Sequence, residues 1–236
     1  MPTLLLINPN TSAHVTDLLA RHAQAQAPAG ATLHALTAPF GAAYIASVEA
    51  AATAAQAVPA AWQAHVAQHG APDAVLVACF GDPGVAALRA RTPVPVLGLA
   101  EVAMREADAI AAATPDGRYA IVTGGAAWGP MLEALADQLD LRRRLAGVVT
   151  VERTGAELLA DPAAAQALLL GACQDALALG TPGPVRAIVI GGAALADLAA
   201  PLAPHLPVPL IDNVRAGLAA AWHAACNSPD HLTETP

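Results

Sequence analysis

Short apolar runs recur along the whole chain and alternate with Ala-rich stretches. The runs are continuous rather than interrupted by polar residues at every second position, which is typical of parallel strands covered by helices on both faces. The Ala-rich stretches are long enough to cross back over a sheet as helices. The predicted strands are Leu4–Ile7, Thr32–Leu36, Ala74–Ala78, Val94–Leu97, Tyr119–Thr123, Val148–Val151, Ala187–Ile190 and Val208–Ile211. The pattern therefore predicts a parallel α/β fold.

Three segments of the first half have counterparts in the second half, in the same order and at nearly the same distance along the chain. The pairs are Leu5–Asn10 with Ala120–Gly125 at an offset of 115 residues, Ala74–Cys79 with Ala187–Gly192 at 113, and Pro93–Leu97 with Pro207–Ile211 at 114. A period of this length is too long for a solenoid repeat. It indicates an internal duplication.

The duplication predicts two similar parallel-sheet α/β lobes related by pseudo-two-fold symmetry. We place the first lobe at residues 1–100 plus 212–236 and the second at residues 101–211. Ligands of parallel sheets bind beyond the carboxyl ends of the strands, so we expect an active-site cleft between the lobes, lined by the turns that follow four strands. These turns are Asn8–Ser12, Cys79–Gly84, Thr123–Trp128 and Gly192–Ala194.

Composition and charge exclude several classes of partner. Hydrophobic residues make up 56% of the chain and aromatic residues only 3%, which argues against surfaces that stack nucleic-acid bases. The net charge is −8. The one basic cluster, Arg142–Arg144, follows a helical segment, and positive charges at the C-terminal end of a helix are stabilised by its dipole. We therefore expect a small-molecule substrate and no nucleic-acid partner, and we expect a homo-oligomer.

The start of the chain and its cysteines bear on location. Met1–Thr3 leads directly into the first strand without a basic segment, so we expect no secretory signal. No uninterrupted apolar run reaches about 18 residues, so we expect no membrane span. Cys79, Cys173 and Cys226 are odd in number and lack metal-binding spacing, which indicates reduced thiols in a cytoplasmic protein. Cys173 and Cys226 fall on helical segments and are interpreted as structural.

Cys79 is the candidate catalytic residue. It ends a strand and opens a Gly- and Pro-containing turn before a helix, so backbone N–H groups and a helix dipole are expected to lower its pKa below the free-thiol value of about 8.5. The alternative is an inert buried cysteine. The turn favours a reactive position, and it places Phe80, Gly81 and Asp82 beside the substrate.

The turn after the first strand is a candidate for substrate binding. Thr11 or Ser12 can cap the next helix. Asn8, Asn10 and free backbone N–H groups can hold a carboxylate or an imide carbonyl. The turn lacks the Gly and Lys of a phosphate-binding loop.

Two turns of the second half complete the candidate site. In the turn Thr123–Gly125, the glycines Gly124 and Gly125 allow close backbone approach, and N–H groups of the turn can stabilise an oxyanion; the alternative is a plain strand-to-helix turn. Gly192, with Ala193 and Ala194 after it, occupies the counterpart of Cys79. These small residues leave room for a bulky substituent.

Metal and cofactor chemistry have little support. His65 and His69 stand four residues apart on a predicted helix, a spacing that can bind a metal, but no third ligand is evident. There is no Gly-x-Ser-x-Gly nucleophile motif and no nucleotide-binding loop. We therefore expect no catalytic metal and no organic cofactor.

Three segments resemble one enzyme family. Ile7–Ser12, Ala78–Gly84 and Pro209–Asp212 are similar to the hydantoin and allantoin racemase branch of the aspartate/glutamate racemase superfamily. The resemblance implies a two-lobed α/β fold without metal, pyridoxal or flavin. It also implies two opposed cysteines, one in each lobe, which exchange a proton at a carbon next to a carbonyl.

The chain departs from this pattern at Gly192, where the internal repeat places the second cysteine of the family. Three interpretations remain open. The protein is a racemase or isomerase in which water or a hydroxyl replaces the second thiol; it resembles the one-cysteine malonate decarboxylases of the superfamily, which keep their cysteine in the other lobe; or it binds a small carboxylate without catalysis. The thiol of Cys79 favours an enzyme, and the overall resemblance favours a racemase.

Overall fold

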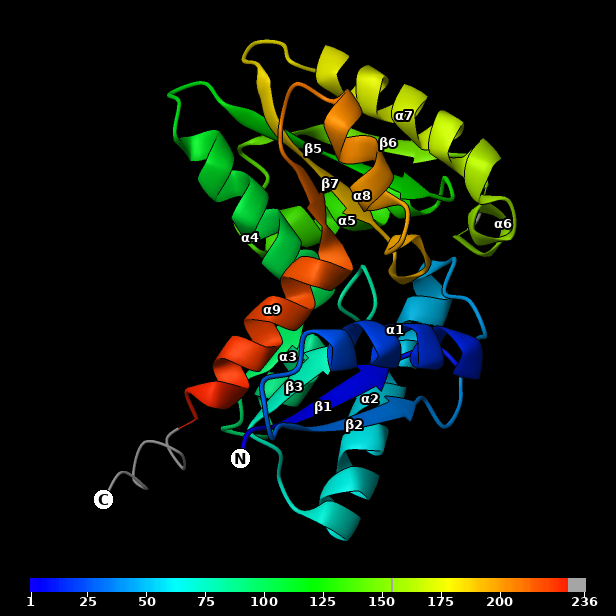
Figure 1. The fold of residues 1–236 in the computed structure, drawn as a ribbon, viewed down its shortest axis with the longest axis vertical. Helices are drawn as coiled ribbons and strands as arrows, with labels where there is room; N and C mark the ends of the chain where they lie inside the picture. The colour runs from blue at the N-terminus through cyan, green and yellow to red at the C-terminus, as the bar shows by residue number, and fades with distance from the viewer. Residues whose placement is uncertain (154, 229–236) are drawn as a thin grey trace. The chain divides into compact units, whose positions relative to one another are not determined.

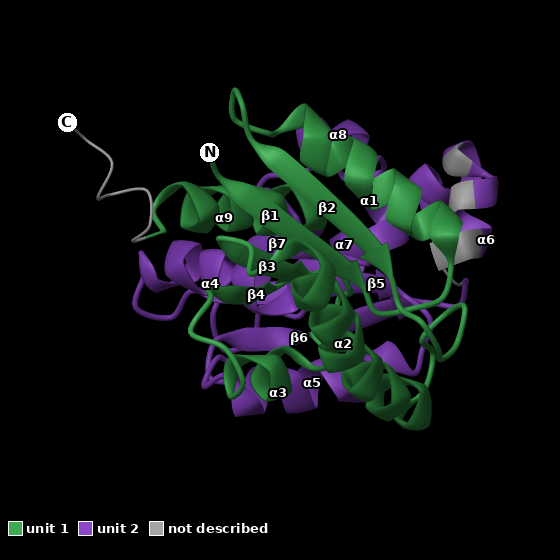
Figure 2. Cartoon of the chain, turned by 90° about the horizontal axis from the view of Figure 1, so that it is seen from below, with its two compact units in different colours: residues 1–99, 214–236 green, residues 100–213 purple. Residues whose placement is uncertain are grey.

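All eight predicted strands form, and they are divided between two separate parallel sheets (Figure 1). The computed structural model describes residues 1–153 and 155–228. Its residues group into unit 1, Met1–Leu99 with Val214–Pro236, and unit 2, Ala100–Asn213 (Figure 2). The predicted α/β fold class with two parallel sheets is confirmed. None of the helices in the described ranges is long and apolar enough to cross a membrane.

Unit 1 is built on a four-stranded sheet in the order β2-β1-β3-β4. Its strands are β1 (Thr3–Asn8), β2 (Thr32–Thr37), β3 (Ala74–Val77) and β4 (Val96–Gly98), and its helices are α1 (Ala13–Ala25), α2 (Val48–His69), α3 (Val85–Arg89) and α9 (Asn213–Cys226). The last helix returns to this unit after unit 2.

Helices cover both faces of the unit 1 sheet, which explains its continuous apolar strands. On one face, α2 packs Trp62 against Leu5 of β1. On the other face, Gly217 of α9 lies against Leu76 of β3, and the indole Nε1 of Trp222 in α9 donates a hydrogen bond to a carbonyl of α1, 3.0 Å away.

Unit 2 repeats this plan with a sheet in the order β6-β5-β7-β8. Its strands are β5 (Arg118–Gly124), β6 (Leu145–Val151), β7 (Val185–Gly191) and β8 (Leu210–Asp212). Its helical elements are α4 (Leu99–Ala112), α5 (Trp128–Gln138), α6 (Gly155–Ala160), α7 (Pro162–Ala178), η1 (Ala193–Leu195), α8 (Ala199–Leu202) and η2 (Ala203–His205).

The register of the strands reproduces the offsets of the internal duplication. Leu5 of β1 pairs with Val75 of β3. Their counterparts at offsets of 115 and 113 residues, Ala120 of β5 and Ile188 of β7, pair with each other in the same way. The duplication is therefore seen in the strand pairing of both sheets as well as in the aligned sequence segments.

We expect Trp222→Ala to lower the free energy of unfolding of unit 1 by about 3–5 kcal/mol, because it empties a buried site. The side chain is 3% exposed. Trp222→Phe keeps most of the ring volume and loses the hydrogen bond, so it should cost roughly 1–3 kcal/mol, the higher figures applying where the acceptor is left buried and unpaired. Urea unfolding followed by circular dichroism measures both. Equal losses in the two variants would contradict the packing role of the indole.

Candidate active site

The carboxyl edge of the unit 1 sheet brings two of the predicted turns together. Ile7 of β1 pairs with Val77 of β3, and the N–H of Ala78 continues the ladder by donating to the carbonyl of Ile7 at 2.8 Å. The chain segments that follow β1 and β3 therefore leave the sheet as neighbours. This edge is where parallel sheets bind ligands.

Asn8 organises the turn after β1. The residue is fully buried, and its amide nitrogen donates to the side-chain oxygens of Asn10 (2.8 Å) and Thr16 (3.0 Å) and to the carbonyl of Ser12 (3.1 Å). Its amide oxygen accepts from the backbone N–H of Asn10 at 3.2 Å. The polar atoms of Asn8 are thus engaged within the turn, so the residue positions its neighbours.

The groups left to face a ligand come from the two residues after Pro9. The Oδ1 of Asn10 accepts from the N–H of Ser12 at 2.9 Å, and the N–H of Thr11 donates to Ala42 at 3.0 Å. Across the described residues, no hydrogen bond involves the Asn10 amide nitrogen or the Thr11 hydroxyl. Ser12 caps α1, with its Oγ 3.4 Å from the N–H of Val15, which confirms the predicted cap.

The turn after β3 folds back on the carbonyl of Cys79. This oxygen accepts from the N–H groups of Gly81 at 3.0 Å and Asp82 at 3.1 Å. Asp82 adopts a positive φ of 51° and is buried, with its carboxyl group against Gly98 of β4. A Cβ at Gly98 would overlap that carboxyl group, so a larger residue there would force the Asp82 side chain to move. Phe80 is buried beside the thiol residue.

The expectation of a lowered pKa at Cys79 is wrong for this structure. Cys79 is only 8% exposed, and burial, followed by the negative charge of Asp82, raises the pKa of the thiol to about 12. Loss of water disfavours the thiolate. The helix that should have offset this effect, α3, begins six residues later and has only five residues, so its dipole is short and distant.

Alkylation by iodoacetamide should report this raised pKa. Because only thiolate reacts and the pKa is about 12, the rate at Cys79 should rise about tenfold for each pH unit from pH 7 to pH 10. Peptide mapping by mass spectrometry follows Cys79 and the exposed Cys226 in one sample. A rate at Cys79 that levels off below pH 9 would show that the thiol is activated as the sequence suggested.

The turn after β5 in unit 2 is held by hydrogen bonds to the neighbouring strands β6 and β7. The hydroxyl of Thr123 donates to the carbonyl of Gly191 at 2.8 Å, and the N–H of Gly125 donates to the carbonyl of Val151 at 2.9 Å. The Gly125 N–H is therefore engaged and is not free for an oxyanion. Gly124 is buried between them. This geometry fits the alternative of a strand-to-helix turn.

Gly192 occupies the position in unit 2 that Cys79 occupies in unit 1, because the equivalent residues of β3 and β7 precede them in register. Its φ is +130°, a backbone conformation that side chains rarely adopt. A Cβ there would lie 3.4 Å from Leu195 and 4.0 Å from the Thr123 hydroxyl, so there is room for a side chain. Ala193 and Ala194 are half-buried beside it.

Two polar features of the structure were not predicted from the sequence. Asn213, the first residue of α9 after β8, donates to the carbonyl of Ile190 at 2.8 Å, while its buried amide oxygen lacks a partner among the described residues. His34 of β2 joins His65 and His69. Burial, then the charges of the two other rings, lower the pKa of His65. Only the pairing of a strand with a helix reveals this cluster, since His34 is far from the other two in sequence.

Comparison with known proteins shows that the chain is similar to racemases. The model of the family described as Asp/Glu/Hydantoin racemase matches residues 4–221. A hydantoin racemase of Paenarthrobacter aurescens is 30% identical over 92% of this chain and 89% of that protein. A hydantoin racemase of Pseudomonas sp. (strain NS671) is 34% identical over 62% of this chain, and the alignment spans 55% of that protein.

Solved structures agree with this comparison. Allantoin racemase from Klebsiella pneumoniae has a TM-score of 0.80 and 31% identity, covering 94% of this chain and 86% of that one. Arylmalonate decarboxylase has a TM-score of 0.60 and 17% identity, covering 96% and 93%. At 17% identity the second likeness concerns the fold alone.

Proposed function

We propose that this chain, which belongs to the Asp/Glu/hydantoin racemase family, is a racemase-type enzyme that uses the thiol of Cys79 to move a proton at a carbon next to a carbonyl. The observation that carries the proposal is the position of Cys79 at the carboxyl edge of the unit 1 sheet, beside the turn after β1. The names of the hydantoin and allantoin racemases among the relatives support the same reaction class.

The proposed substrate is a hydantoin-like ring or a related carboxylate. The net charge of the chain is −8, so its overall electric field does not attract anions. The carbonyl or carboxylate oxygens of the substrate must therefore be held by local hydrogen-bond donors. The amide nitrogen of Asn10 and the hydroxyl of Thr11 are suitable donors at the edge that carries Cys79. No cofactor enters the proposal.

In the proposed reaction, Cys79 acts as the acid. With a pKa raised to about 12, the resting thiol keeps its proton at neutral pH and can deliver it to the carbon of an enolate. The S–H bond breaks, a C–H bond forms, and solvent returns a proton to the thiolate. Removal of the original proton from the opposite face falls to water or a hydroxyl, because Gly192 carries no ionisable group.

A second candidate function is decarboxylation of a substituted malonate, and the raised pKa of Cys79 and the absence of a thiol at Gly192 favour it. Loss of carbon dioxide creates the enolate without a base, so a single protonated thiol completes the reaction. The raised pKa of Cys79 and the glycine at its counterpart position suit that sequence of steps. Both candidates share the protonation step at Cys79.

Proton NMR in deuterated water distinguishes the candidates. The substrates are 5-substituted hydantoins, allantoin, α-amino acids and arylmalonates. Exchange of the α-proton without loss of carbon dioxide supports the racemase, and release of carbon dioxide with deuterium in the product supports the decarboxylase. Neither reaction on any substrate in the panel would contradict an enzymatic role of this kind.

We expect Cys79→Ala to reduce kcat by about 10²- to 10⁴-fold, because it removes the group that transfers the proton. Cys226→Ala is the matched control, since that thiol is exposed and its removal should leave turnover unchanged. Turnover by Cys79→Ala equal to that of the parent enzyme would refute the thiol mechanism.

We further propose that Gly192→Cys should raise α-proton exchange, because the internal duplication places this position where the resemblance to the family implies the second thiol. The positive φ makes any side chain there cost about 1–3 kcal/mol of stability, and Gly192→Ala serves as the control for that strain. Both variants are assayed where circular dichroism shows them folded. Exchange no faster in Gly192→Cys than in Gly192→Ala would contradict this placement.

A further inference from the structure

Unit 1 holds a cluster of three histidines that the proposed reaction does not use. Their ring centroids lie 4.8 to 5.0 Å apart, and one nitrogen from each of His34, His65 and His69 lies within 4.8 Å of the others. Among the described residues, none of the three rings hydrogen-bonds to another side chain or to the backbone. His65 is only 4% exposed, so an unpartnered polar side chain is buried at the centre of the cluster.

Strand and helix periodicity explain why the three rings meet. His34 pairs with Leu5 in the parallel ladder, so both side chains point to the face that α2 covers. Trp62 of α2 packs on that face, and His65 and His69 follow it at three and seven residues, which returns them to the same side of the helix. The cluster thus joins the edge strand β2 to the last turn of α2.

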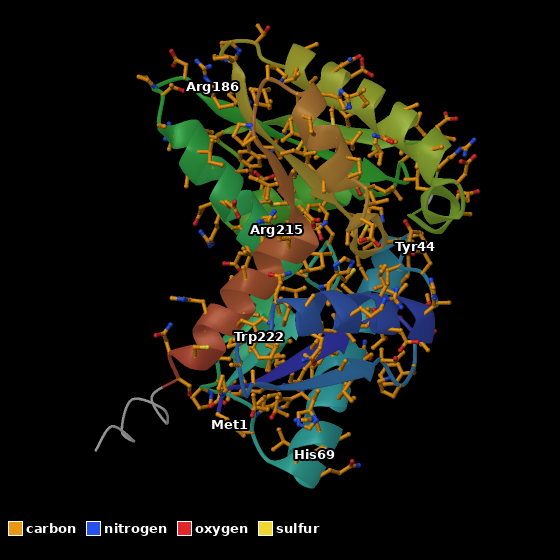
Figure 3. All side chains as sticks on the ribbon, viewed as in Figure 1. Met1, Tyr44, His69, Arg186, Arg215 and Trp222 are labelled. Carbon is orange, nitrogen blue, oxygen red and sulfur yellow. The ribbon has the colours of Figure 1, made fainter. Side chains whose placement is uncertain are left out.

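The cluster lies away from the candidate active site within unit 1. A crossover helix between parallel strands runs opposite to them, so the end of α2 lies towards the amino edge of the sheet, whereas Cys79 follows the carboxyl end of β3. Figure 3 shows His69 at the end of α2. A ligand at the three rings would therefore act on stability and not on the proposed chemistry.

We propose that His34, His65 and His69 bind one divalent transition-metal ion through their ring nitrogens, with water completing the coordination. Imidazole suits Zn²⁺, Cu²⁺ and Ni²⁺, and three histidines with one open position is a known zinc arrangement. Ligand nitrogens around a tetrahedral Zn²⁺ stand about 3.3 Å apart for bonds of about 2.0 Å. The present spacing is up to 4.8 Å, so metal binding requires the exposed His69 and half-buried His34 side chains to rotate inwards.

Isothermal titration of the metal-free protein with zinc chloride tests the site, in a Cys226→Ser background that removes the exposed thiol. We expect one Zn²⁺ per chain. His34→Gln and His69→Gln should each weaken binding by about 100-fold or more, beyond the 10- to 100-fold cost of losing an outer-shell partner. His205→Gln, which changes an exposed histidine of unit 2, should bind as the parent does.

Thermal unfolding gives an independent measure. Zinc at a hundredfold excess over its Kd should raise the Tm of the parent by about 5–10 °C and that of His69→Gln by at most about 1–2 °C, because a 100-fold weaker site is only half occupied. His69 is exposed, so this variant is expected to fold, and its circular dichroism spectrum should match that of the parent. No bound zinc in the parent, or equal affinity in the parent and both ligand variants, would overturn the proposal whatever reaction the enzyme catalyses.

Discussion

The structure depends on the burial of its central strands on both faces. Every side chain from Leu4 to Ile7 and from Tyr119 to Val122 is fully buried, so these segments carry apolar side chains, and the buried hydroxyl of Tyr119 donates a hydrogen bond to the carbonyl of Leu141. In β1 the buried polar side chain lies where the strand ends, at Asn8, and there neighbouring polar groups must satisfy it. The network around Asn8 is the result: a fully buried amide whose donors and acceptor are all used before any ligand arrives.

The same burial controls the chemistry of Cys79. The residue stands just past the end of β3, so it is close enough to the core to lose its water and too far from α3 to gain a strong dipole. The carboxyl group of Asp82 adds a like charge. A thiol in this setting is a weak acid, and its proton is transferred only when the acceptor is a still stronger base, as the carbon of an enolate is.

The sequence predicted what depends on local periodicity. The eight strands and the offset between the two halves follow from continuous apolar runs, and the register of Leu5 with Val75 agrees with them. It could not predict the pKa of Cys79, because desolvation depends on how Phe80 and Asp82 fold around the thiol. The role of His34 was hidden for a related reason: its partners lie on another element, and only tertiary packing brings them together.

Two sheets of one topology therefore carry different chemistry at equivalent positions. In unit 1 the turn after β3 holds the thiol of Cys79. In unit 2 the equivalent turn after β7 holds Gly192, in a backbone conformation that disfavours any side chain. A Cβ there would meet no atom closer than 3.4 Å, so space alone does not explain the glycine. Backbone strain does: the turn at φ +130° is favourable for glycine and costly for cysteine. A thiol introduced at this position would therefore have to overcome that strain.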